Sequence, residues 1–136
     1  MIVILCIDDK YGMMFNHRRQ SKDRFLLEDI TDYTRENKLY MNDYSYKMFS
    51  EFKIPKLIVD NKFLDKAGSG EYCFVEDSSL LLYEQHIEKL IIYRWNRRYP
   101  ADLYLDILLE KTWRLIDTKE FKGYSHEKIT KEIYIR

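Results

Sequence analysis

Residues 2–7, IVILCI, form an unbroken apolar run that ends at the polar segment Asp8-Asp9-Lys10-Tyr11-Gly12. A strand with one face in water alternates apolar and polar residues, whereas a strand buried on both faces is apolar throughout. The run is therefore predicted to be a central parallel strand followed by a turn. Since parallel strands are covered by helices, this feature favours an α/β fold.

Strand and helix patterns alternate along the next part of the chain. A helix is predicted from an N-cap at Ser21 to about Glu36, because Leu26, Ile30 and Tyr33 share one face. The other predicted segments are strands over 38–41, 56–59, 71–75 and 89–95, helices over 44–52 and 80–88, and one helical turn over 63–67.

The last part of the chain predicts two further strands, over 113–121 and 129–135, joined by a loop that contains Gly123 and Ser125. Together they form a C-terminal antiparallel hairpin that completes a mostly parallel, mixed sheet. A chain of 136 residues suits one core, so residues 1–136 are predicted to form a single domain.

Composition and charge limit the classes of function that are expected. The 46% hydrophobic residues supply a core, and the 23 basic and 23 acidic residues cancel, so no overall field attracts a polyanion. A nucleic-acid partner is therefore not expected. The opening apolar run is far shorter than a membrane span, so no membrane association is expected and the cytoplasm is the predicted location.

Metal chemistry is not expected either. The two cysteines lack CxxC spacing, and His17, His86 and His126 lie far apart in the sequence. The chain also lacks the HxHxDH cluster that the metallo-β-lactamase class needs to hold two metals, so it does not support a ribonuclease Z activity.

Several of these segments together resemble dihydrofolate reductase. They are the opening strand followed by Asp8-Asp9-Lys10-Tyr11-Gly12-Met13, a polar loop, a helix beginning near Asp23, a strand ending at Met41, and the hairpin of 113–136. The resemblance covers most of the chain. It implies a three-layer α/β fold with a mostly parallel mixed sheet.

The resemblance also implies a site. The segment 12–20 matches the mobile loop that closes over substrate and nicotinamide, and Asp23 matches the buried carboxylate that binds the pterin and assists its protonation. Tyr93 matches a threonine that hydrogen-bonds this acid, so Asp23 and Tyr93 are the predicted catalytic residues. Ser45 matches a hydroxyl that faces the cofactor. An acid at this place is also common as a simple helix cap.

The polar loop offers cations for a ligand. His17, Arg18 and Arg19 are predicted to bind an anionic ligand, because guanidinium binds carboxylate or phosphate through paired hydrogen bonds. The alternative is that these residues belong to a solvent-exposed connecting loop and bind no ligand.

Three departures from the family concern NADPH. Asn42-Asp43 stands where a Gly-Arg pair would contact phosphates, Glu76-Asp77 stands where paired glycines would approach the pyrophosphate, and residues 54–71 leave little room for the adenine half. NADPH is therefore not the expected cofactor.

The leading interpretation is a protein that binds a small anionic or heterocyclic ligand in a cleft around Asp23. A reductase with altered cofactor or substrate use is one alternative. A protein-interaction module, including a homodimer, is the other.

Overall fold

The computed structural model describes residues 1–136, which form two sheets, two longer helices and several short helical turns. The main sheet contains β1 (Ile2–Ile7), β4 (Leu39–Met41), β5 (Leu57–Val59), β6 (Tyr72–Phe74), β7 (Lys89–Arg94), β9 (Arg114–Phe121) and β10 (Ile129–Ile135). A small sheet contains β2 (Gly12–Phe15), β3 (Arg18–Arg19) and β8 (Leu103–Tyr104). The helical elements are α1 (Arg24–Tyr33), α2 (Asp43–Phe49), α3 (Leu109–Thr112), η1 (Phe63–Asp65) and η2 (Leu81–His86).

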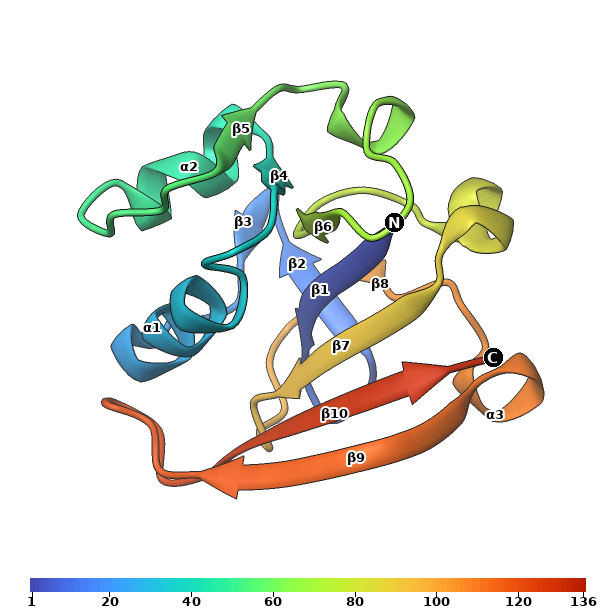
Figure 1. Cartoon of the computed structure of the whole chain (residues 1–136). Helices are drawn as coiled ribbons and strands as arrows, with labels where there is room; N and C mark the ends of the chain where they lie inside the picture. The colour runs from blue at the N-terminus through green and yellow to red at the C-terminus, as the bar shows by residue number, and fades with distance from the viewer.

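The main sheet has the strand order β5-β4-β6-β1-β7-β10-β9 (Figure 1). The strand β1 lies in the middle and pairs in parallel with β6 and β7, as its apolar sequence predicts. The strand β10 runs antiparallel to both β7 and β9. The predicted mixed sheet with a C-terminal antiparallel hairpin is therefore confirmed.

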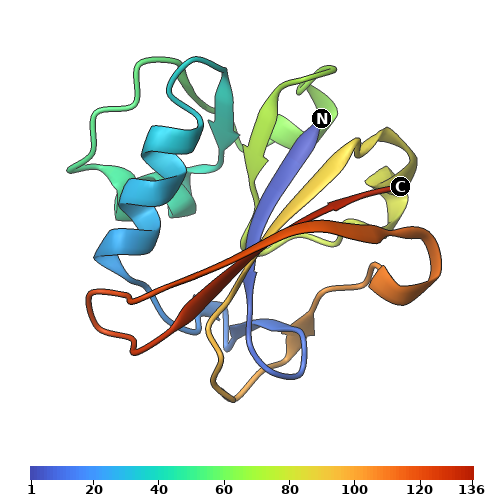
Figure 2. The same ribbon diagram turned by 60° about the horizontal axis from the view of Figure 1, so that its bottom comes forward.

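Alternate residues of β1 enter two separate cores, which gives the molecule three layers. Ile2 and Ile4 pack with buried residues of α1 and α2. Val3, Leu5 and Ile7 pack on the opposite face, under η1, η2, α3 and the small sheet. Figures 1 and 2 show α1 and α2 on the same side of the sheet. Both longer helices therefore border one face, and the candidate site lies on that face.

Some local predictions were wrong. The segment 12–20, predicted to be a loop without strands, contains the β2–β3 hairpin, and its mobility stays a prediction. Its turn places Asn16 and His17 at φ values of 52° and 62°. Two successive positive φ values match the twist of tight hairpins, and Asn adopts them readily.

Three helix boundaries also differ from prediction. The first helix ends at Tyr33 instead of Glu36, the second ends at Phe49 instead of Phe52, and the predicted helix over 80–88 is a 3-10 helix, η2. None of the helices has the length and apolar character needed to cross a membrane.

Candidate functional site

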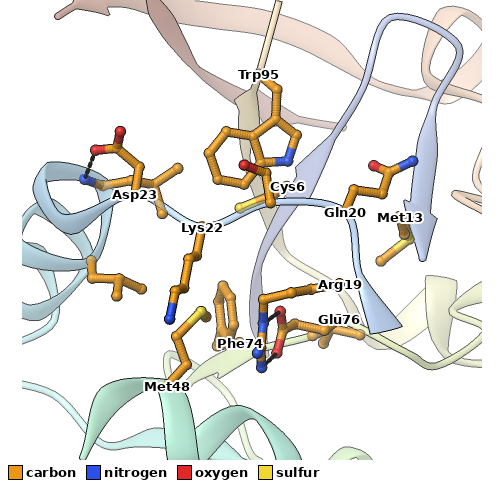
Figure 3. Close-up of a pocket in the computed structure, with 14 residues that line it drawn as sticks. Cys6, Met13, Arg19, Gln20, Lys22, Asp23, Met48, Phe74, Glu76 and Trp95 are labelled. Atoms are coloured by element: carbon orange, nitrogen blue, oxygen red, sulfur yellow. Dashed lines mark hydrogen bonds and ion pairs between the residues drawn. The ribbon is translucent and has the colours of Figure 1, made fainter. Parts of the chain in front are cut away.

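An enclosed cavity lies beneath α1 and α2, at the carboxyl ends of the central parallel strands. Cys6 of β1, Phe74 of β6 and Trp95, which follows β7, contribute to its walls (Figure 3). Its volume is about 20 Å³, which is room for little more than a water molecule. Burial raises the pKa of the Cys6 thiol well above its usual value, so this cysteine is a poor nucleophile.

A wider groove of about 460 Å³ lies outside this cavity, between α1 and α2. The cavity and the groove share Lys22, Asp23, Leu27 and Met48, so they adjoin one another. Lys22, Arg24 and Lys47 line the groove, and its acids are Asp23 and Glu51. The two spaces are called the cleft below.

Asp23 is the N-cap of α1, not a residue of its first turn, and the predicted cap Ser21 was wrong. The Asp23 carboxylate accepts hydrogen bonds from the backbone N–H groups of Phe25 (2.9 Å) and Leu26 (3.4 Å). These groups lack partners within the helix, so a side-chain acceptor at this position stabilises the first turn.

The loop between β9 and β10 folds back onto the same carboxylate. Asp23 accepts hydrogen bonds from the backbone of Tyr124 (3.0 Å) and Ser125 (2.9 Å), and its Oδ2 lies 2.9 Å from His126 Nδ1. Burial alone would raise the pKa of the Asp23 carboxyl, but these hydrogen bonds outweigh burial and lower the pKa from 3.8 to about 2. The carboxylate is therefore ionised and bound on several sides, with its side chain fully shielded from solvent.

Close approach of this loop depends on Gly123. A Cβ atom at this position would lie 2.6 Å from Asp23 Oδ2 and 2.9 Å from Ile129. Only glycine leaves room for the loop backbone to reach the carboxylate without a shift of its surroundings.

His126 is buried at the junction of these elements. Its Nε2 lies 2.9 Å from Ser21 Oγ and 3.3 Å from the Tyr99 hydroxyl, and its ring stacks on Trp95 at 4.7 Å between centroids. Sequence reasoning set His126 aside because no other histidine or cysteine stands at ligand spacing. The only local sign of a role for His126 was its position next to the loop residues Gly123 and Ser125. Its contact with Asp23 joins residues more than one hundred positions apart, which no local pattern predicts.

Arg19 and Ser45 meet at one acid, Glu76. Glu76 accepts two hydrogen bonds from the Arg19 guanidinium (2.8 and 3.0 Å) and one from Ser45 Oγ (2.8 Å). The guanidinium also lies over the Tyr44 ring, 4.4 Å from its centroid. This network joins β3 to α2, and its Arg19–Glu76 ion pair lies at one side of the cavity (Figure 3).

Comparison with known proteins identifies the architecture. No protein-family model matches the chain, and no curated protein matches it. Among solved structures it is similar to the dihydrofolate reductase from Enterococcus faecalis complexed with NADP(H) and RAB-propyl, with a TM-score of 0.69, 10% identity, and coverage of 99% of this chain and 95% of that chain. This chain has a dihydrofolate reductase-like fold.

Within this dihydrofolate reductase-like fold, Tyr93 does not contact Asp23 as predicted. Its hydroxyl donates a hydrogen bond to Asp29 Oδ2 (2.5 Å), which also accepts one from Lys131 Nζ (2.9 Å). Burial and the neighbouring Asp29 raise the pKa of Tyr93 far above its usual value. The catalytic assignment of Asp23 and Tyr93 stays a prediction, and these contacts point to structural anchoring.

The other predicted ligand residues separate into two groups. Arg19 lines the cavity and Ser45 does not, but both are hydrogen-bonded to Glu76, which does line it. His17 and Arg18 are exposed at the turn of the β2–β3 hairpin and do not line the cleft. The structure thus brings Arg19 and Ser45 together and leaves the other two outside.

The start of α2 is acidic. Asn42 caps this helix by accepting a hydrogen bond from the backbone of Ser45 (2.9 Å), and its side chain donates one to Asp77 (3.0 Å). Asp43 is the first residue of the helix.

No group of three or more His, Cys, Asp or Glu side chains is placed to hold a metal ion.

Proposed function

We propose that the protein binds a small anionic or heterocyclic ligand in the cleft between α1 and α2. The observation that carries this proposal is Gln20 Oε1, a buried oxygen with no hydrogen-bond partner in a residue that lines the cavity. Buried acceptors without a partner are rare, and a shift of the Gln20 side chain toward the cavity would let a ligand N–H or O–H group satisfy this one. The cavity has room for little more than a water molecule, so the body of the ligand would lie in the adjoining groove of about 460 Å³.

Charge at the groove supports the anionic part of the proposal. Lys22, Arg24 and Lys47 bring three positive charges to its lining. The Asp23 carboxylate is already occupied by hydrogen bonds within the fold, and Glu51 lies 3.9 Å from Arg24. A carboxylate or phosphate on the ligand would therefore meet mainly positive charge.

NADPH does not fit this proposal. Two positions that the resemblance assigns to the cofactor, Ser45 and Glu76, are hydrogen-bonded to each other, and Glu76 is also paired with Arg19. Asp43 and Asp77 stand at the start of α2, where a phosphate would meet repulsion. The Enterococcus faecalis enzyme, by contrast, is described in complex with NADP(H).

The same contacts give less support to the two alternatives, a reductase and a protein-interaction module. A reductase that uses Asp23 as its proton donor conflicts with a carboxyl whose pKa is about 2. The homodimer, the cytoplasmic location and the absence of a nucleic-acid partner stay predictions. Sedimentation over a range of protein concentrations tests self-association.

A thermal-shift series tests the ligand proposal, with folate, a pterin without the glutamate tail, and guanosine monophosphate as probes. At least one probe should raise the melting temperature. The double variant Lys22→Gln/Lys47→Gln should weaken its binding by roughly tenfold or more, because a hydrogen bond to a charged group contributes about 1.5–3 kcal/mol. The exposed Lys62→Gln is the matched control and should bind as wild type does.

Two outcomes contradict the proposal. If no probe changes the melting temperature, the cleft is not the binding site of such a ligand. The same conclusion follows if the double variant binds a probe as tightly as wild type does. Low-micromolar binding of NADPH in a calorimetric titration would refute the cofactor argument alone.

A further inference from the structure

Three side chains in the cleft wall form a continuous hydrogen-bonded chain. Ser21 Oγ lies 2.9 Å from His126 Nε2, and His126 Nδ1 lies 2.9 Å from Asp23 Oδ2. We propose that Ser21, His126 and Asp23 form a nucleophilic site that cleaves esters of a short acyl group. This connectivity, a hydroxyl to one ring nitrogen and a buried carboxylate to the other, is the arrangement that activates serine in hydrolases.

The contacts of Asp23 set the tautomer of His126. The carboxylate is ionised and can only accept hydrogen bonds, so His126 Nδ1 carries the proton that points at Asp23. In the neutral ring, Nε2 is then an acceptor and can take the hydroxyl proton of Ser21. A general base needs this tautomer.

The ring of His126 is also held in place. It is buried, with 6% of its surface exposed, and it stacks on Trp95. The other groups that face it are the Tyr99 hydroxyl, 3.3 Å from Nε2, and Ser125 Oγ, 3.3 Å from Nδ1. Both distances are longer than the 2.9 Å distances from His126 to Ser21 and to Asp23. The two shortest hydrogen bonds of the ring are therefore the ones that link Ser21 to Asp23.

Ser21 has access to the cleft. It is only half-buried and lines the cavity, as Lys22 does. Figure 3 shows Gln20, Lys22 and Asp23 on the connecting segment that borders this space. The cavity of about 20 Å³ is smaller than an acetyl group, so the acyl group extends into the adjoining groove, and only short acyl groups are expected to fit. The adjoining groove accommodates the alcohol part of the ester.

The reaction proceeds in two steps. Ser21 Oγ attacks the carbonyl carbon, its proton passes to His126 Nε2, and the ester C–O bond breaks as the alcohol leaves with that proton. Water then attacks the acyl-serine, gives its proton to His126, and releases the carboxylic acid with the serine hydroxyl restored. No oxidation or metal ion is involved.

Hydrolysis of p-nitrophenyl acetate by the full chain tests this site. The protein should release p-nitrophenolate faster than buffer does, and mass spectrometry should locate an acetyl group on Ser21. Ser21→Ala should lose roughly a hundredfold or more of the rate above buffer, the usual share of an activated nucleophile and its base. Ser69→Ala, which changes an exposed serine outside the cleft, should keep that rate.

Labelling of the wild-type chain tests the site without a substitution at Ser21. A small sulfonyl fluoride should modify Ser21 alone, and His126→Gln should abolish the modification. Acetylation of lysines or tyrosines with an unchanged rate in Ser21→Ala would overturn the proposal, as would a sulfonyl fluoride adduct elsewhere. This inference goes beyond ligand binding: the Lys22/Lys47 variant probes the binding site and Ser21 probes acyl transfer, so either can fail alone.

Discussion

Replacing Asp23 with asparagine should destabilise the protein by about 3 kcal/mol near neutral pH. Each Asp23 oxygen accepts hydrogen bonds from donors: Oδ1 from the start of α1 and from Tyr124, and Oδ2 from Ser125 and His126. In asparagine one of these two oxygens is replaced by an NH₂ group, which is a donor and would face the donors that the oxygen accepts from. A buried donor left without its acceptor costs about 1–3 kcal/mol.

The pH dependence gives a second estimate of this energy. The pKa of Asp23 falls from 3.8 to about 2 on folding, which corresponds to about 2 kcal/mol of stability from the ionised carboxylate. Because the folded pKa is the lower one, this contribution is complete well above pH 3.8. It falls to roughly half at pH 3 and is nearly lost at pH 2.

Urea denaturation of wild type and Asp23→Asn at pH 7 and pH 3 measures both effects. The difference in unfolding free energy between the two proteins should shrink on acidification. Asp117→Asn removes the same charge from an exposed position of β9 and should change stability by less than about 0.5 kcal/mol. A difference between wild type and Asp23→Asn that is this small at pH 7, or that does not change with pH, would refute the reasoning.

Two further substitutions test the contacts around the cleft. Gly123→Ala would place a Cβ 2.6 Å from Asp23 Oδ2, so the variant should lose about 1–3 kcal/mol, measured as a lower urea midpoint. Glu76→Gln leaves the half-buried Arg19 guanidinium without its ion pair and should cost about 2 kcal/mol. In a double-mutant cycle, adding Arg19→Gln should recover part of this loss; simple additivity of the two changes would contradict the ion pair.

Much of the fold could be predicted because its signals are local. The unbroken apolar run of β1 indicates burial on both faces, and the alternation of Ile129, Ile133 and Ile135 indicates a strand near the end of the chain. The β2–β3 hairpin was missed because its strands are only four and two residues long. In addition, its turn uses Asn-His, which is a weaker signal than Asn-Gly.

The site was less predictable because its contacts join distant segments. Asp23 was correctly placed at the start of the helix, but nothing local indicates that residues 123–126 bind its carboxylate. Likewise, Arg19 follows an exposed hairpin turn, and its ion pair with Glu76 spans 57 positions. Side-chain partners of this kind follow from tertiary packing and have no periodicity in the sequence.

The distribution of charge in the cleft has one consequence for its chemistry. Glu76 is neutralised by Arg19, and the Asp23 carboxylate is bound by backbone N–H groups and His126, so two buried acids are occupied within the fold. A pterin reductase would use an acid that retains its proton, and the lowered pKa of Asp23 disfavours that role for this carboxyl. The same binding of Asp23 fixes the orientation of His126 toward Ser21. The contacts that lower the pKa of Asp23 disfavour a proton donor at this position, and they support the proposed chemistry, in which His126 accepts a proton from the Ser21 hydroxyl.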